Sequence, residues 1–169
     1  GDDVKGSELL KKAIAIIDDE AIVAQLYNTY GIVCPRLGDR QGSLNAFDKG
    51  LEISSRLKLD ELLVYNLRMN KANTLATISK YEDAMKLHLT NLKSAEIQSD
   101  ESRQLLTFNN IAILLRLQND YPAALEYYRK SLALAKKLNA VSSIGLAQMN
   151  MAIVYALQKN TDAAEESFT

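Results

Sequence analysis

The chain has 169 residues, of which 47% are hydrophobic and 24% are charged, with only 7 Gly and 2 Pro. This balance is typical of a folded, largely helical protein and differs from the composition of a disordered chain. Its 20 basic and 21 acidic residues give a formal net charge of -1, so no excess of positive charge favours nucleic acid or an anionic membrane surface as a partner.

The scarcity of reactive side chains excludes several classes of site. One cysteine, Cys34, and one histidine, His88, leave no internal disulfide and no Cys/His zinc site. Apolar runs are short and interrupted by polar residues, below the ~20 residues that span a bilayer. The sequence contains no glycine-rich phosphate loop, nucleophile elbow or metal motif. We expect no catalytic residue, metal, cofactor or membrane span, no enzyme activity, and a cytoplasmic location.

The predicted elements begin with a helix in residues 1–19, which are followed by four segments that resemble one another. Its KKAIAII parallels KGLEISS and RKSLALA further along, so we interpret 1–19 as the second helix of a partial repeat. Similar second helices start, at steps of 41, 40 and 40 residues, at Arg40, Tyr81, Tyr121 and Thr161. Such a fixed period is typical of stacked repeats. We expect a single array from a longer protein, with repeats at 20–59, 60–99 and 100–140 and a truncated repeat at 141–169.

Two columns of small residues recur within these repeats. The first helices supply Gly31, Ala72, Ala112 and Ala152, and the second helices, twelve residues later, supply Ser43, Ala84, Ala124 and Ala164. Small side chains allow two antiparallel helices to approach closely. Four residues beyond the second column stand Phe47, His88, Tyr128 and Phe168. We interpret His88 as a core residue with satisfied hydrogen bonds and not as a catalytic group.

These columns resemble the tetratricopeptide repeat. A period near 40 residues, in place of about 34, and the stretch FNNIAILL followed by NDYPAALEYYRKSLALA resemble the long-helix subtype of kinesin light chain and bacterial signalling arrays. Two features depart from the family pattern: the usual inter-repeat Pro is missing, and the usual Trp column holds Tyr27, Arg68, Phe108 and Gln148. The resemblance implies an all-α, right-handed superhelical solenoid of antiparallel helix pairs, whose first helices line a concave wall.

Asparagines recur on the predicted first helices. Two residues before the small column stand Thr29, Asn70, Asn110 and Asn150. Asn is a mediocre helix former, so its recurrence requires a compensating gain. The resemblance implies that amides at this place contact the backbone of an extended peptide; alternatively, they tie neighbouring helices together or remain hydrated. With others on or near the same wall, the candidate binding residues are Asn70, Asn110, Asn150, Asn73, Asn109, Asn66, Arg68 and Arg116.

Three hypotheses for function follow from this reading. The leading one is a protein-interaction scaffold that binds a peptide or a partner helix on its concave face. The alternative is a ligand- or peptide-sensing segment of a bacterial signalling or transcription-regulatory protein. A third is end-to-end self-association through uncapped repeats. The first two predict a protein or peptide partner, and all three remain open at this point.

Overall fold

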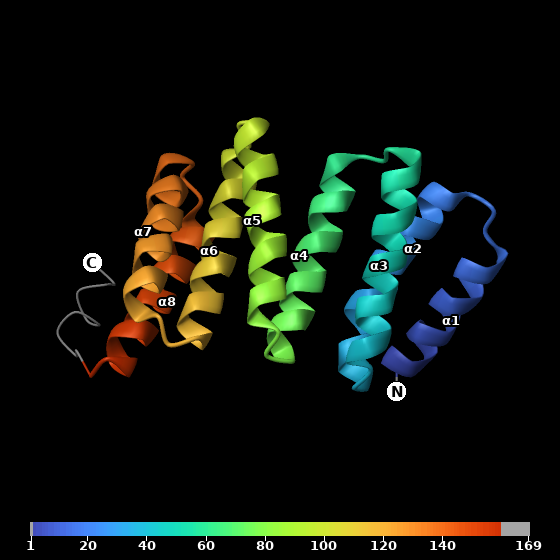
Figure 1. Cartoon of the computed structure of the whole chain (residues 1–169), viewed down its shortest axis with the longest axis horizontal. Helices are drawn as coiled ribbons and strands as arrows, with labels where there is room; N and C mark the ends of the chain where they lie inside the picture. The colour runs from blue at the N-terminus through green and yellow to red at the C-terminus, as the bar shows by residue number, and fades with distance from the viewer. Residues whose placement is uncertain (1, 160–169) are drawn as a thin grey trace. The chain divides into compact units, whose positions relative to one another are not determined.

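The computed structural model describes residues 2–159, which contain eight α-helices, one short 3-10 helix and no strand (Figure 1). The elements are α1 (Asp2–Ile16), α2 (Glu20–Val33), η1 (Cys34–Leu37), α3 (Arg40–Leu57), α4 (Glu61–Thr77), α5 (Tyr81–Ile97), α6 (Glu101–Leu117), α7 (Tyr121–Lys137) and α8 (Val141–Leu157). The predicted all-α class is confirmed over this range. The second helix predicted for the last repeat, with Ala164 and Phe168, lies outside the described residues.

The chain divides into two compact units, and the division falls inside α5, between Leu87 and His88. In the first unit α1 packs on α2, α2 on α3 and α3 on α4, and α2 also contacts α4. In the second unit α6 packs on α7 and α7 on α8, and α6 also contacts α8. Consecutive helices within each unit run antiparallel (Figure 1). We call α2, α4, α6 and α8 first helices, and α3, α5 and α7 second helices.

One turn geometry recurs along the chain. A residue with positive φ stands every 20 or 21 residues, at Gly38, Lys58, Ser79, Ser99, Asn119, Asn139 and Lys159. In the turns between helices the residue after it donates its N–H to a carbonyl five residues earlier, as Asp100 does to Ala95 at 2.8 Å. This is the hydrogen bond of a Schellman motif, which satisfies carbonyls at the end of a helix. The turns therefore fix a regular alternation of helix and connection.

Aspartates begin several of the helices. The Oδ1 atoms of Asp19, Asp39, Asp100 and Asp120 each accept an N–H from the first turn, at distances between 2.7 and 3.2 Å. An N-cap of this kind stabilises a helix by about 1 kcal/mol. The caps supply partners for backbone donors that the helix itself cannot satisfy.

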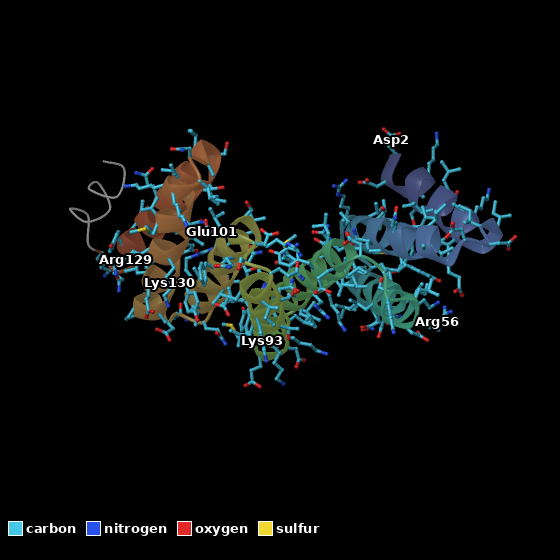
Figure 2. The ribbon with its side chains drawn as sticks, turned by 90° about the horizontal axis from the view of Figure 1, so that it is seen from above. Asp2, Arg56, Lys93, Glu101, Arg129 and Lys130 are labelled. Atoms are coloured by element: carbon cyan, nitrogen blue, oxygen red, sulfur yellow. The ribbon has the colours of Figure 1, made fainter. Side chains whose placement is uncertain are left out.

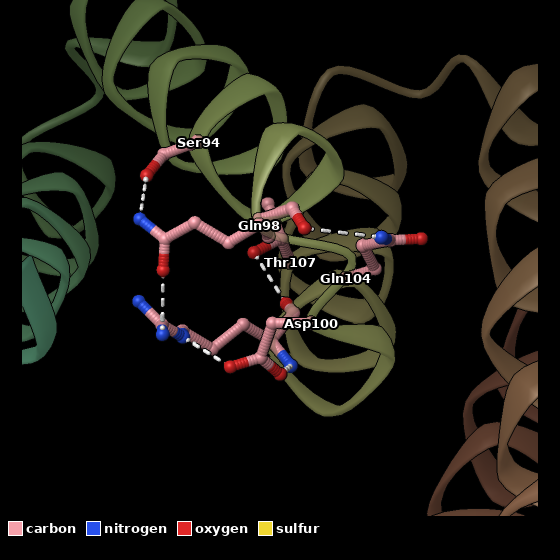
Figure 3. Close-up of polar contacts among 7 residues, drawn as sticks. Ser94, Gln98, Asp100, Gln104 and Thr107 are labelled. Atoms are coloured by element: carbon pink, nitrogen blue, oxygen red, sulfur yellow. Dashed lines mark hydrogen bonds and ion pairs between the residues drawn. The ribbon is translucent and has the colours of Figure 1, made fainter.

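The start of α6 is fixed by a larger network (Figure 3). Arg103 Nε donates to Asp100 Oδ2 at 2.6 Å, and Arg103 Nη2 donates to Gln98 Oε1 at 2.9 Å. Gln104 Nε2 donates to the carbonyl of Ala95 at 3.2 Å. The backbone N–H and then the guanidinium of Arg103 hold the pKa of Asp100 below its ordinary value. This network ties α6 to the end of α5.

The small column lies where the helices approach most closely. Gly31, Ala72 and Ala112 are buried, and Ala152 is half-buried. At Gly31 an added Cβ would lie only 2.5 Å from the ring of Phe47. In the second unit Ala112 packs into a core cluster with Ala124, Leu125, Tyr128, Met151 and Val154. The small residues that the sequence predicted at helix contacts therefore also leave room for the rings of Phe47 and Tyr128.

His88 is 1% exposed, so its interpretation as a core residue is confirmed. The expectation that its hydrogen bonds are satisfied is wrong for one atom, because Nδ1 has no hydrogen-bond partner within the described chain. Burial in this setting disfavours the charged imidazolium and lowers the pKa of His88 to about 4. The same column holds Phe47, whose side chain has no polar atom, and Tyr128, whose buried hydroxyl likewise has no hydrogen-bond partner within residues 2–159.

We predict that His88 makes the fold sensitive to acid. The unfolded chain takes up this proton near pH 6.5, whereas the folded protein does so near pH 4. As the pH falls through this window the unfolded state binds the proton first, so the free energy of unfolding decreases, by about 3 kcal/mol. His88→Phe, which copies the residue at Phe47, should remove that contribution. Urea unfolding at pH 7, 5.5 and 4 measures it; equal acid losses in both proteins would contradict the assignment.

Candidate functional site

Charged residues concentrate on the second helices. α3, α5 and α7 each contain five Asp, Glu, Lys or Arg residues, whereas α2, α4 and α6 contain one, three and three, and α8 contains none. Figure 2 shows Arg56, Lys93, Arg129 and Lys130, all on second helices, with side chains that project from the ribbon. The first helices therefore present surfaces with little charge.

Side chains spaced three or four residues apart form one side of each first helix, and all of those named below except the buried Asn150 are exposed or half-buried. We call the set on α2 and α4 the unit-1 face, which consists of Gln25, Thr29, Ile32, Asn66, Asn70 and Asn73. We call the set on α6 and α8 the unit-2 face, which consists of Leu106, Asn110, Ile113, Leu146, Asn150 and Ile153. The unit-1 face is mostly polar. The unit-2 face has aliphatic side chains before and after an amide on each helix.

Three of the predicted amides, Asn70, Asn109 and Asn150, take part in bonds that tie neighbouring first helices together. Asn70 Nδ2 on α4 donates to Asn28 Oδ1 on α2 at 3.0 Å. Asn150 Nδ2 on α8 donates to Asn109 Oδ1 on α6 at 3.1 Å. Both pairs join equivalent places on adjacent helices, as the alternative interpretation proposed. Each donor amide still keeps one N–H and its carbonyl oxygen for another partner.

Three other candidate amides are free of such bonds. Asn66, Asn73 and Asn110 make no side-chain hydrogen bond within residues 2–159. Asn73 is exposed, and Asn66 and Asn110 are half-buried. These amides keep donors and an acceptor directed at no other protein group, so they are available to a ligand.

The candidate arginines differ in their partners. Arg68 Nη1 lies 3.4 Å from Glu61 Oε1 on the same helix. Arg116, in the last turn of α6, is half-buried and has no carboxylate partner in the described range, and its Nε has no hydrogen-bond partner there. Burial raises the pKa of the Tyr128 phenol, and the nearby guanidinium of Arg116 opposes that rise. Within residues 2–159, the guanidinium of Arg116 therefore lies beside the Tyr128 phenol and has no carboxylate countercharge.

The cavities of the two units have different linings. In the first unit, one of about 460 Å³ includes the Arg68–Glu61 pair, and one of about 430 Å³ includes the Lys71–Asp48 pair. In the second unit a cavity of about 350 Å³ has no charged residue, and its walls are Ser102, Leu105, Leu106, Leu138, Ala140 and Ser143. This second-unit cavity, which we call the leucine pocket, adjoins the unit-2 face at Leu106.

The described part of the chain contains neither a metal-binding cluster nor a membrane span. Over residues 2–159 no group of three or more His, Cys, Asp or Glu side chains could hold a metal ion. No helix in that range is long and apolar enough to cross a membrane.

Comparison with known proteins identifies the repeat. Residues 62–137, which cover α5 to α7 and all of α4 except Glu61, match the model of the tetratricopeptide repeat family. The fold resembles that of BtubC (BKLC) from P. vanneervenii, with 19% identity and a TM-score of 0.85 over 99% of this chain and 70% of that chain. The tetratricopeptide-repeat resemblance predicted from the sequence is therefore confirmed. No curated protein sequence matches the chain.

Two further structures share this fold. A putative kinesin light chain of Podosopora anserina with nearly identical TPR-like repeats has 14% identity and a TM-score of 0.78, over 98% of this chain and 83% of that chain. A Rap protein complexed with competence and sporulation factor has 16% identity and a TM-score of 0.84, over 99% of this chain. The chain spans 47% of that Rap protein. At these identities the likeness establishes the fold alone.

We predict that the Asn109–Asn150 bond stabilises the second unit. Asn150→Ala would leave the buried Oδ1 of Asn109 without its donor and should lower the free energy of unfolding by about 1–3 kcal/mol. Asn110→Ala is the matched control, because its amide has no partner in the described chain, and should change stability by less than about 0.5 kcal/mol. Urea unfolding followed by circular dichroism gives both values. Similar losses in the two variants would refute the structural role of the bond.

Proposed function

We propose that this protein is an interaction scaffold whose unit-1 and unit-2 faces bind an extended peptide or a helix of a partner protein. The observation that carries the proposal is the set of accessible amides at Asn66, Asn73 and Asn110, which have no hydrogen-bond partner in the described chain and lie on charge-poor helices. The tetratricopeptide repeats at 62–137 support it. So does the similar Rap protein, whose structure holds competence and sporulation factor.

The chemistry of these faces suits a peptide backbone. An extended segment leaves N–H and C=O groups unpaired, and an asparagine amide can accept from one and donate to the other. Aliphatic neighbours such as Leu106 and Ile153 then bury apolar side chains of the partner. Because few charges lie on the first helices, affinity arises from these contacts and depends little on net charge.

The proposed role is binding without catalysis, and each candidate residue has a part in it. Asn66, Asn73 and Asn110 contact the partner, with Arg68 and Arg116 as sites for its acidic groups. Asn70, Asn109 and Asn150 keep neighbouring first helices in register, so that the faces are formed before the partner arrives. A free, buried Cys34 is compatible with a reducing compartment such as the cytoplasm.

We predict that removal of the free amides weakens peptide binding while the fold persists. Peptides are first selected from a displayed random library on the immobilised chain. The best binder should then bind at least tenfold more weakly to a variant with Asn66→Ala, Asn73→Ala and Asn110→Ala, as measured by fluorescence anisotropy. A control with Asn45→Ala, Glu82→Ala and Lys93→Ala removes exposed polar groups from second helices and should bind normally. Equal binding by both variants would argue against these faces.

A second function, a peptide-sensing segment, shares this binding surface but requires the chain to change shape. The Rap protein complexed with competence and sporulation factor has a similar fold, which supports this second function. A scaffold should hold its radius of gyration when saturated with the selected peptide, whereas a sensor should show a reproducible shift, because its ligand must prefer one of two states. Small-angle X-ray scattering with and without peptide distinguishes the two.

A further inference from the structure

Arg116 differs from the other half-buried cations of the described chain. Arg68 faces Glu61 at 3.4 Å, Lys71 pairs with Asp48, and Arg103 pairs with Asp100 at 2.6 Å. Arg116 is equally half-buried but pairs with no carboxylate in residues 2–159. A charge removed from water is unfavourable unless a countercharge or hydrogen bonds replace the lost hydration. The backbone carbonyls at the end of α6 offset part of the positive charge of Arg116. A carboxylate of a bound partner would neutralise the rest.

The leucine pocket lies beside the same helix, near its other end. Three leucines, one alanine and two serines line it, without any charged side chain. Leu106 and Leu138 in its wall remain 44% and 38% exposed. The helix beyond it, α8, contains no charged residue, and its accessible residues Leu146 and Ile153 are aliphatic. Covering these surfaces with an aliphatic side chain would remove apolar area from water.

Three features thus follow one another along α6: the pocket at Leu106, the amide of Asn110, which has no partner in residues 2–159, and the guanidinium of Arg116, which pairs with no carboxylate there. Ten residues separate Leu106 from Arg116, which is about 15 Å at the helical rise of about 1.5 Å per residue. An extended peptide advances about 3.3 Å per residue and covers this distance in about four or five residues.

We propose that the unit-2 face recognises an extended peptide with an aliphatic side chain and a carboxylate separated by four or five residues. The aliphatic group enters the leucine pocket, the carboxylate pairs with Arg116, and the backbone between them bonds to Asn110. This inference rests on the proposed scaffold function and specifies its ligand in the second unit. An extended segment fits better than a helix, because a helix has already used its backbone N–H and C=O groups and offers none to Asn110.

The first experiment selects random 12-residue peptides by display on the immobilised chain and sequences the enriched pool. An excess of aliphatic and acidic residues four or five positions apart is the expected result. An excess ten positions apart would mean that a helix binds along α6 and would overturn the extended conformation. A pool enriched in basic peptides would overturn the pairing with Arg116.

A double-mutant cycle then tests the ion pair directly. Binding of the best fluorescein-labelled peptide should fall at least tenfold with Arg116→Gln, and similarly when the acidic residue of the peptide becomes its amide. The two changes together should weaken binding little more than either alone, which marks a direct interaction. Lys136→Gln removes the same charge from an exposed site on α7 and should change the affinity less than twofold. Independent, multiplying losses would refute the assignment.

Two further variants separate this inference from the broader proposal. Leu106→Ser should weaken binding of the selected peptide at least fivefold, and Arg116→Lys, which keeps the charge, should retain more binding than Arg116→Gln. Thermal melts by circular dichroism verify that each variant folds. Binding that is lost in Asn66→Ala with Asn73→Ala but unchanged in Leu106→Ser would overturn the unit-2 site and leave the scaffold proposal intact. Failure of every library peptide to enrich would count against both.

Discussion

A two-helix hairpin cannot bury its apolar side alone, and the rest of this structure depends on that constraint. Each hairpin must pack on a neighbour, so the helices have to match in length and meet at small residues. The five helices from α4 to α8 are each 17 residues long. Buried Ala72 and Ala112 provide the close approach, and the repeated Schellman turns return the chain at the right place. Stacking then leaves one accessible side on each first helix.

The accessible side combines two uses of one residue type. The side chains of Asn70 and Asn150 each donate one hydrogen bond to a neighbouring first helix. The side chains of Asn66, Asn73 and Asn110 make no hydrogen bond within the described chain. The bonded amides hold neighbouring first helices at a fixed distance. The other three amides are exposed or half-buried at the protein surface. A surface whose geometry is fixed in advance loses less conformational freedom on binding. In the proposed function, the bonded amides of each unit therefore hold in place the amides that would contact the partner.

The repeat period was enough to predict the fold, but it did not predict which asparagine side chains bond to each other. The helical class and the small columns could be predicted because Gly31, Ala72 and Ala112 recur at a fixed step and burial follows from that phase. Ties between neighbouring helices were one of the alternatives, but the particular pairs Asn28–Asn70 and Asn109–Asn150 were not predicted. Asn28 and Asn109 stand one position before the column of Thr29, Asn70, Asn110 and Asn150. The available signal was that Asn28 and Asn109 each stand about one repeat before another asparagine, 42 residues before Asn70 and 41 before Asn150.

The hydrogen-bond and ion-pair partners of individual side chains could not be predicted from the sequence. Arg68 and Arg116 are the same residue type on equivalent helices. Arg68 has a carboxylate 3.4 Å away, whereas Arg116 has no carboxylate partner in the described chain. His88 was placed correctly in the core, but its unpaired Nδ1 follows from which groups happen to surround the ring. The position of a residue in the repeat determines whether its side chain is buried. Its hydrogen-bond and ion-pair partners depend on neighbouring residues that differ from one repeat to the next.

The turns have a consequence for how such a chain can be altered. Ser99 and Asn139 stand at the same point of two turns, with φ of 52° and 53°, and each is followed by the same backbone hydrogen bond. A cut at both places releases a hairpin whose two ends share one backbone geometry. That hairpin is an exchangeable cassette: duplication, deletion or transplantation of it joins like to like, and leaves the neighbouring helices to find the same kind of contact as before.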